Sequence, residues 1–314
     1  MADGVRTCRP LRRLIGRMQW RVAEAALERE VMARILAGRA VVEKMADDIK
    51  ERIAALAERG VTPTLAIVRV GERPDDLSYE RTALRRAEAL GVAVRSVVLA
   101  ADATEDELAC AIERVNADAS IHGCLLFRPL PKSMNETRIC DMLAVEKDID
   151  GIARTSLAGV FTDDPTVFPP STAQACLEVL DAYGIDVAGK HVVVIGRSLV
   201  VGKPVAMMLL GRHASVTICH SRTERLDEIC READIVICAT GRARAFGATY
   251  FRAGQTVLDV GINFDEAGKL CGDVDYEAVE PLVGAITPVP GGVGSVTTSV
   301  TMMHTVRAAE RAAR

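Results

Sequence analysis

Strand-length apolar segments alternate with helical segments along most of this chain. In the first half the strand-like segments are "TLAIVRV" (64–70), "AVRSVVLA" (93–100) and "IHGCLLF" (121–127). Segments 75–91 and 104–118, which lie between them, repeat their apolar residues at helical spacing. Because this order favours a mostly parallel sheet with helices on its faces, we predict an α/β fold.

The second half repeats the alternation after Pro169. A helix is expected over 171–184, and strands are expected at 190–196, 215–220, 234–240 and 256–262. A last helix, roughly 294–312, is predicted to pack back on the first domain. We therefore expect an extension at 1–32, a first domain at 33–168 completed by 294–314, and a second domain at 169–293, with a cleft between the two domains.

Side chains that can cap a helix stand at three of the expected helix starts. They are Asp75 or Asp76, Thr104 with Glu107 as a capping box, and Ser171 or Thr172. Gly91 can end the helix over 75–91, whose apolar positions are Leu84, Ala87 and Leu90. Tyr79 and Ala83 are four residues apart, so we expect them to share one face of that helix.

Composition excludes several classes of protein. The formal net charge of −4 provides no basic surface for nucleic acid, and no apolar run is long enough to cross a bilayer. The nine scattered cysteines form no C-x-x-C pair and indicate reduced thiols in a cytoplasmic protein. Residues 1–32 are rich in arginine and include the only tryptophan, Trp20. We interpret them as a dispensable extension, with a helical arm or a targeting peptide as alternatives.

The stretch "VVVIGRSLVVGKPVAMML" (192–209) has the strand–turn–helix order of a dinucleotide-binding site. Gly196 ends the strand, and Gly202 allows the helix to approach the sheet closely. The free N–H groups at the start of that helix can bind a pyrophosphate. Ser198 stands where the second glycine of G-x-G-x-x-G is expected, so a tight turn without a ligand is the alternative interpretation.

Residues after the next strand indicate which dinucleotide would bind. An NAD site carries an acidic residue about twenty positions on, but here the strand ends in His220, Ser221 and Arg222. Arg197 adds a cation beside Gly196. Because guanidinium groups match phosphate oxygens, this pattern favours NADP over NAD. The alternative is that these arginines are solvated surface charges.

Five segments, in this order and spacing, together resemble the methylenetetrahydrofolate dehydrogenase/cyclohydrolase family. They are "KDIDG" (147–151), "GRSLVVGKP" (196–204), "DVGIN" (259–263), "GDV" (272–274) and "ITPVPGGVGSVT" (286–297). The resemblance covers about residue 33 to the C-terminus. It implies an N-terminal α/β folate-binding domain, a Rossmann-like NAD(P)-binding domain, and usually a homodimer. It also implies that methylenetetrahydrofolate is oxidised to a methenyl cation, which water then opens to formyltetrahydrofolate.

The resemblance also implies site residues. Tyr79 matches the residue that stacks on the folate, Asp150 matches the one that holds the pterin, and a loop walls the pterin pocket with Pro290, Gly291 and Gly292. Cofactor contacts fall on Gly196, Arg197, Ser198, Ser221, Ile262 and Thr297, and the pattern itself adds Gly202. Read without the family, Asp150 would be a helix cap or a turn residue.

The chain departs from the family pattern at two important positions. The lysine of Y-x-x-x-K is Ala83, and the glutamine that supports this lysine is Phe127 in "GCLLFRPLP" (123–131). Two smaller departures are "STAQA" (171–175), where the family has C-T-P-[KR]-G, and Ser295, where it has proline. Arg81, Arg85 and Arg86 are close in sequence but are expected to point away from Tyr79.

These departures separate the two reactions of the family. Hydration needs positioned proton transfer, typically worth about 10²–10⁴-fold, which alanine cannot provide. Hydride transfer needs mainly positioning, and the rings of Tyr79 and Phe127 can accommodate a cationic product. We therefore predict a dehydrogenase with weak or lost cyclohydrolase activity. The alternatives are a bifunctional enzyme, a non-catalytic protein that binds folate or NADP, and an enzyme with an altered substrate.

Overall fold

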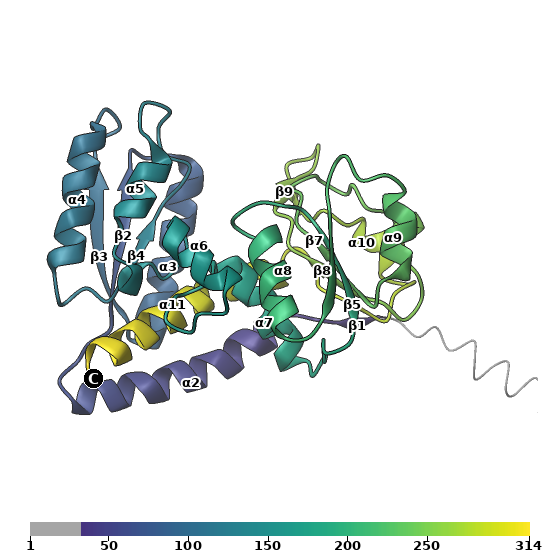
Figure 1. Cartoon of the computed structure of the whole chain (residues 1–314), viewed down its shortest axis with the longest axis horizontal. Coiled ribbons are helices and arrows are strands. Elements are labelled where there is room, and N and C mark those ends of the chain that lie inside the picture. Colours follow the sequence, from purple (N-terminus) through teal and green to yellow (C-terminus); the bar gives the residue numbers. More distant parts are fainter. Residues whose placement is uncertain (1–32) are drawn as a thin grey trace, which may run out of the picture.

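The computed structural model describes residues 33–314 as two α/β domains joined by long helices (Figure 1). The first domain contains a parallel sheet of three strands in the order β3 (Ala93–Leu99), β2 (Thr64–Val70), β4 (Gly123–Leu126). Its helices are α3 (Pro74–Leu90), α4 (Glu105–Ala117), α5 (Glu136–Met142) and α6 (Arg154–Phe161). The predicted parallel α/β arrangement is confirmed.

The second domain contains a parallel sheet of six strands, as expected for a Rossmann-like domain. Their order is β1 (Arg34–Ile35), β11 (Ala285–Ile286), β8 (Thr256–Asp259), β7 (Ile235–Cys238), β5 (His191–Ile195), β6 (Ser215–Cys219). The helices of this domain are α8 (Gly202–Gly211), α9 (Leu226–Glu232) and α10 (Tyr276–Val279), and a short antiparallel pair, β9 (Asn263–Phe264) with β10 (Leu270–Cys271), lies beside the sheet. Short 3₁₀ turns are η1 (Val145–Lys147) and η2 (Ala248–Tyr250).

No strand is predicted from the sequence at 34–35, and the expected domain boundary assigns these residues to the first domain. In the structure Arg34 and Ile35 pair with Ala285 and Ile286, so this short segment belongs to the sheet of the second domain. The chain then crosses to the first domain through α2 (Gly38–Glu58), a helix along the base of the molecule in Figure 1. The predicted extension, with Trp20, lies outside the described residues.

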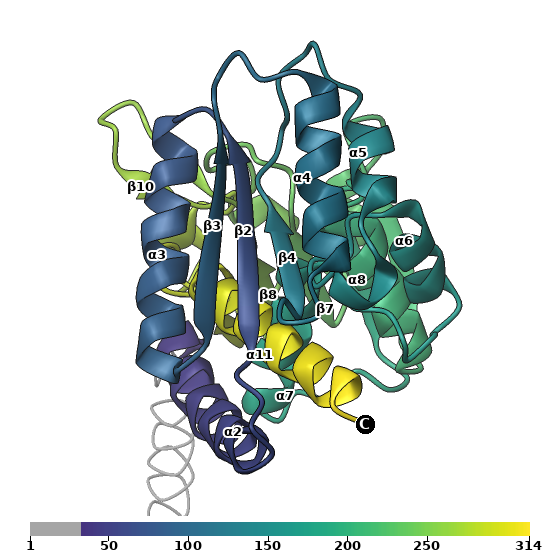
Figure 2. The same ribbon diagram turned by 90° about the vertical axis from the view of Figure 1, so that its left-hand side faces the viewer.

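Helix α11 (Val293–Ala312) runs between the domains. It packs against α2 and α7 (Ser171–Ala182) and also contacts α3, β2 and β4. Figure 2 shows it in yellow, behind the strands of the first sheet and next to α7. The prediction that the last helix packs back on the first domain is confirmed. No helix in the described part of the chain is both long and apolar enough to cross a membrane.

Helix ends follow the sequence signals only in part. The capping box is confirmed: the N–H of Glu107 donates to the Thr104 hydroxyl over 3.2 Å, and the N–H of Thr104 donates to Glu107 over 2.7 Å. Gly91 ends α3 with φ of 87°, as expected. The predicted caps of the other two helices are wrong: Arg73 and Pro170 occupy the cap positions, without side-chain capping bonds.

Two of the residues predicted as caps, Asp76 and Ser171, have other partners in the structure. Asp76 lies inside the first turn of α3, where the Arg73 guanidinium donates two hydrogen bonds to it over 2.7 and 2.8 Å. The N–H of Ser171, in the first turn of α7, donates to Asp150. The predicted apolar face of α3 also needs correction, because Leu84 is 38% exposed whereas Ala87 and Leu90 are buried.

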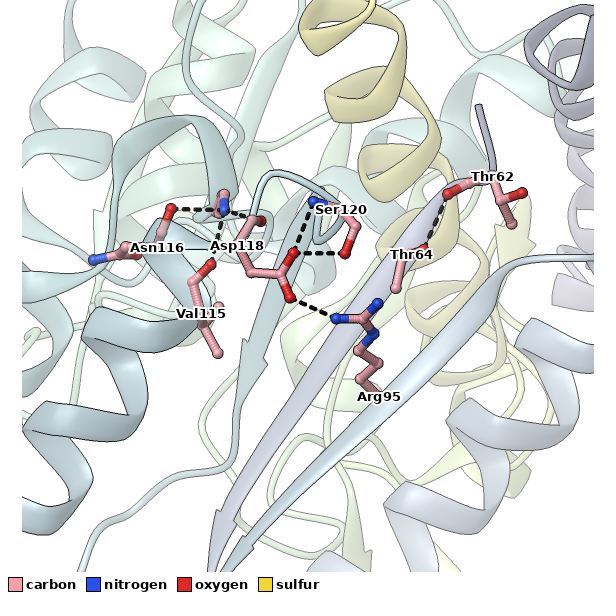
Figure 3. Close-up of polar contacts among 8 residues, drawn as sticks. Thr62, Thr64, Arg95, Val115, Asn116, Asp118 and Ser120 are labelled. Carbon is pink, nitrogen blue, oxygen red and sulfur yellow. Dashed lines mark hydrogen bonds and ion pairs between the residues drawn. The ribbon is translucent and has the colours of Figure 1, made fainter. Parts of the chain in front are cut away.

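The segment that carries Asp150 is held to the end of α4. The buried ammonium of Lys147 donates to the backbone carbonyls of Val115, Asn116 and Asp118 over 2.7–2.8 Å. Figure 3 shows these acceptors, with the Asp118 carboxylate turned toward Arg95 and Ser120. A cation at the C-terminal carbonyls of a helix is favourable because it opposes the helix dipole. The start of "KDIDG" is therefore anchored three residues before Asp150.

Candidate active site

A cleft of about 540 Å³ lies between the two domains. Its residues from the first domain include Tyr79, Phe127, Arg128, Glu136 and Asp150, and the second domain contributes Val200, Val260 and Ile262. Gly294 and Thr297 line it from the first turn of α11. Residues predicted from opposite ends of the sequence thus meet in one cavity, at the carboxyl ends of β2 and β4.

Two aromatic rings form one wall of this cleft. The ring centroids of Tyr79 and Phe127 are 5.6 Å apart, with an interplanar angle of 63°, which is an edge-to-face contact. Tyr79 is 36% exposed, whereas Phe127 is only 6% exposed. Partial desolvation of the phenol by the walls of the cleft, together with the nearby negative charge of Asp150, raises the pKa of Tyr79 above its usual value. The phenol therefore stays neutral at physiological pH.

Ala83 is not part of the wall. Its methyl group is fully buried in the same apolar cluster as Phe127, and it does not line the cleft. Tyr79 and Ala83 are one turn apart on α3, as expected, but of the two only Tyr79 lines the cleft. The helix turns the alanine into the core one turn after the tyrosine. Arg81 and Arg85 are exposed and lie outside the cleft lining, as expected.

Asp150 lines the cleft and also holds the start of a helix. Its carboxylate accepts a hydrogen bond from the first N–H of α7, that of Ser171, over 3.0 Å. Asp148 makes the local turn instead, accepting from the N–H groups of Ile152 and Ala153 over 3.0 and 2.9 Å. Burial raises the pKa of Asp150, while hydrogen bonds from Ser171 and the positive charge of Arg128 act to lower it.

Further charged groups line the cleft that sequence reasoning did not assign to it. Asp75 and Asp76 were interpreted as caps, and Glu136 was not singled out. Glu136 lies 3.9 Å from the guanidinium of Arg128 and accepts the N–H of Leu130 over 2.8 Å. The only sequence signal for these groups is their position just after β2 and β4, at the edge where ligands bind in α/β folds.

The glycine-rich loop before α11 shapes the cleft indirectly. Pro290 and Gly291 are exposed, Gly292 is buried, and none of the three lines the cavity. The carbonyl of Gly291 accepts the N–H of Gly38 over 2.7 Å, and the carbonyl of Gly292 accepts the Ser295 hydroxyl over 2.7 Å. A Cβ on Gly292 would lie 2.4 Å from the carbonyl oxygen of Pro288. A glycine at residue 292 is therefore needed for the loop to lead into α11 directly below the cleft.

A second pocket, of about 790 Å³, lies at the carboxyl ends of β5, β6 and β7. Its lining brings together four of the predicted cofactor residues, Gly196, Arg197, Ser198 and Ser221. Gly202 does not line this pocket, but its lack of a side chain allows the close turn beside it. A Cβ at residue 202 would lie 2.2 Å from the carbonyl oxygen of Gly196. Gly196 has φ of 137°, which a residue with a side chain rarely adopts. Ile262 and Thr297 lie in the interdomain cleft instead.

The second pocket is rich in arginine. Arg197, Arg225 and Arg242 line it, and the carboxylate among the lining residues is Asp227. Arg222, which the sequence had placed with Arg197, does not line the pocket; its N–H donates to His220 over 3.2 Å in the turn after β6. Arg225 and Arg242 replace it, from the start of α9 and from the loop after β7. A cationic pocket next to a glycine turn fits the phosphates of a dinucleotide.

Asp273 joins the loops of the two pockets. Its fully buried carboxylate accepts hydrogen bonds from the N–H groups of Thr240 and Arg242, beside the arginine-rich pocket, and from the side-chain amide of Asn263, next to Ile262. Asp259 accepts the N–H of Asp273 over 2.9 Å, and burial raises the pKa of Asp259 to about 6. The "DVGIN" and "GDV" segments thus form one hydrogen-bonded unit.

Comparison with known proteins places both halves of the chain in one family. A family model described as the catalytic domain of tetrahydrofolate dehydrogenase/cyclohydrolase matches residues 36–150. A model described as the NAD(P)-binding domain of the same family matches residues 170–313. The bifunctional protein FolD of Carboxydothermus hydrogenoformans is 50% identical over 281 residues, covering 89% of this chain and 98% of that protein.

Solved structures agree with this assignment. The bifunctional enzyme FolD of Campylobacter jejuni has a TM-score of 0.87 at 35% identity, covering 89% of this chain and 99% of that one. The FolD of Trypanosoma brucei, solved with NADP cofactor and an inhibitor, has a TM-score of 0.85 at 32% identity, covering 90% and 99%. The chain therefore belongs to the tetrahydrofolate dehydrogenase/cyclohydrolase family of enzymes, and its second half is the NAD(P)-binding domain of that family.

Proposed function

We propose that this protein oxidises methylenetetrahydrofolate to methenyltetrahydrofolate with NADP, and that its cyclohydrolase activity is weak or lost. The observation that carries the proposal is the buried methyl group of Ala83, at the position of the family lysine, behind a wall formed by Tyr79 and Phe127. Among the described residues that line the cleft there is no lysine or histidine. The cleft can therefore hold two reactants without carrying an amine base.

Three carboxylates and one guanidinium of the cleft are already engaged and are poor substitutes for a lysine. The Asp76 carboxylate is bound by Arg73, Glu136 lies beside Arg128 and accepts the N–H of Leu130, and Asp150 is bound by Ser171. The guanidinium of Arg128 does not give up its proton. Opening the methenyl cation needs such a transfer, so we expect the hydration step to lose about 10²–10⁴-fold.

The dehydrogenase step makes different demands, which these residues meet. NADP supplies the hydride acceptor, and the arginines of the second pocket would hold its phosphates. The rings of Tyr79 and Phe127 would flank the substrate, and Asp150 would hold the polar edge of the pterin. Such positioning alone can supply several kcal/mol of the rate enhancement. The cationic product is tolerated because aromatic faces and carboxylates surround it.

A spectrophotometric assay tests the proposal. Nicotinamide reduction and methenyl absorbance are followed together, with methenyl cyclohydrolysis measured separately. We expect NADPH and methenyltetrahydrofolate to accumulate in equal amounts. Release of formyltetrahydrofolate at a rate that matches NADPH formation would contradict the loss of hydration. It would instead support the bifunctional alternative, which the names of the relatives favour.

We also propose a homodimer formed through the first domain. Strand β3 is at the edge of its sheet, so one side of its backbone pairs with no other strand of residues 33–314. Val98 on β3 is 50% exposed and Leu84 on α3 is 38% exposed. Natural proteins usually cover such an apolar edge. Analytical ultracentrifugation is expected to give twice the chain mass, and Val98→Lys is expected to give monomers.

A further inference from the structure

Asp273 connects the arginine-rich second pocket to the interdomain cleft. It is fully buried in the segment after β10, and donors surround its carboxylate. On the side of the second pocket, the N–H groups of Thr240, Gly241 and Arg242 donate to it over 2.5, 3.2 and 2.8 Å. The Thr240 hydroxyl donates to the same carboxylate over 2.9 Å. Because Thr240 and Arg242 line the second pocket, this carboxylate sets the position of part of its wall.

The same carboxylate also holds a segment that reaches the cleft. The side-chain amide of Asn263 donates over 2.9 Å to Oδ1, the oxygen that also accepts the N–H of Arg242. Gly261 packs so closely against this oxygen that a Cβ there would lie 2.3 Å from it. Ile262 lies between Gly261 and Asn263 in the chain and lines the cleft. One carboxylate oxygen therefore joins the wall of the second pocket to a residue of the cleft.

The two segments leave the sheet from neighbouring strands. Thr240 comes after the carboxyl end of β7, and Val260, which lines the cleft, follows that of β8. Since β7 and β8 pair in parallel, both segments leave the same edge of the sheet. Asp259, the last residue of β8, accepts the N–H of Asp273 over 2.9 Å. The carboxylate of Asp273 is thereby tied to the edge from which both segments leave.

The donors around residue 273 explain why a carboxylate is needed there. An ionised carboxylate only accepts hydrogen bonds, whereas an asparagine amide has an N–H₂ group in place of one oxygen. Both oxygens of Asp273 face donors, so an asparagine would set its own N–H groups against one of them. A buried donor that faces another donor loses its hydrogen bond. Asp273→Asn is therefore expected to release either residues 240–242 or Asn263.

We propose that Asp273 is a positioning residue for hydride transfer. It holds residues 240–242, which would contact the phosphate half of NADP, in fixed register with Ile262, which faces the folate cleft. The inference rests on the proposed function, since it assumes that the cofactor reaches from the second pocket into the cleft. Asp273 itself lines neither cavity, so it acts only through the residues that it holds.

A half-cofactor tests the two sides of this contact separately. Adenosine 2′,5′-bisphosphate carries phosphates for the second pocket but no nicotinamide, so its affinity in calorimetry reports on that pocket alone. Asn263→Ala removes the bond on the cleft side and retains those from Thr240 and Arg242. We expect this variant to bind the bisphosphate as the wild type does. Its kcat for NADP reduction should fall about tenfold, as for a lost hydrogen bond to a charged group.

Asp273→Asn disturbs both sides, so its affinity for the bisphosphate should fall about tenfold together with kcat. Asp148→Asn is the matched control for stability. Asp148 is also a fully buried carboxylate, and it accepts the N–H groups of Ile152 and Ala153 in the first domain. Its Tm should fall, with the affinity for the bisphosphate unchanged.

Each outcome of these measurements decides the proposal. A wild-type kcat in Asn263→Ala would overturn it, as would a loss of bisphosphate affinity in Asp148→Asn equal to that in Asp273→Asn. A lower kcat in Asn263→Ala with unchanged bisphosphate affinity would support it. If the wild-type protein does not reduce NADP at all, the proposed function is wrong. Calorimetry of Asn263→Ala then tests Asp273 separately: weaker binding of NADP but not of the bisphosphate supports positioning, and equal effects on both ligands overturn it.

Discussion

The ring of Phe127 meets the ring of Tyr79 edge-on, at 5.6 Å between centroids, on the wall of the interdomain cleft. Phe127, one of the two rings, stands where the family pattern has a glutamine. Ala83 is buried in the same apolar cluster as Phe127, so we expect the effects of changing these two positions to depend on each other.

This relationship predicts that hydration returns only when both positions change. Ala83→Lys together with Phe127→Gln should raise the cyclohydrolase rate by about 10²-fold or more, because the amine regains a polar partner. Ala83→Lys alone should lower the free energy of unfolding by about 3–5 kcal/mol, since it buries an unpaired ammonium. Formyltetrahydrofolate release and chemical denaturation measure the two effects. An equal rate gain in the single variant would show that Phe127 does not restrict the site.

Close backbone contact at Gly202 predicts a loss of nucleotide binding on substitution. A Cβ would lie 2.2 Å from the carbonyl oxygen of Gly196, so Gly202→Ala must displace the turn or the helix start, at a cost of about 1–3 kcal/mol. We expect Gly202→Ala to lose more NADP affinity, measured by calorimetry, than Gly247→Ala does. Gly247 is the control because a Cβ there meets nothing within 4 Å and its φ is −90°. Equal binding by both variants would contradict the assignment.

The arginine-rich pocket predicts a preference for the 2′-phosphate of NADP. Arg225→Ala and Arg242→Ala should each weaken NADP binding by about tenfold at low salt, while NAD binding changes little. Arg222→Ala is the matched control, since Arg222 does not line the pocket. The difference should shrink as salt is added, because exposed charges are screened. A parallel loss of NAD binding would indicate a structural effect instead.

Buried His304 predicts that stability falls on acidification. Burial lowers its pKa from 6.5 to about 4, with Arg307 and Arg311 acting in the same direction, while its bond to the Ile149 carbonyl over 2.8 Å acts to raise it. The folded state therefore favours neutral histidine. The stability that this provides is present above pH 6.5 and is lost as the pH falls toward 4.

The shift of His304 is worth roughly 3 kcal/mol at most. His304→Asn keeps a donor for Ile149 but cannot titrate, so its free energy of unfolding should fall less steeply than that of the wild type between pH 6.5 and 4. Urea denaturation at a series of pH values measures both slopes. Because other groups titrate in the same range, the difference between the two proteins is the test. Identical slopes would show that His304 does not contribute.

Local patterns in the sequence were sufficient for most of the fold. β2 begins and ends at the predicted residues, the capping box of Thr104 and Glu107 forms, and Gly91 ends α3 in the left-handed conformation. Gly196 and Gly202 were identified from the strand–turn–helix order of the sequence, because a tight turn between a strand and a helix leaves no room for side chains. Such features depend on neighbours within a few residues, so the sequence contains the information directly.

The composition of the site depended on contacts between distant parts of the chain. Packing of α3, α7, α11 and the second sheet decides three features of the site. Ala83 is buried, Arg225 and Arg242 line the second pocket in place of Arg222, and Ser171 pairs with Thr301. Ser171 and Thr301 are 130 residues apart and meet only because α11 runs between the domains. The sequence by itself thus determined most helices and strands and the turn of the nucleotide site. Tertiary packing decided which side chains share a cavity, because a local pattern contains no information about contacts between residues far apart in the chain.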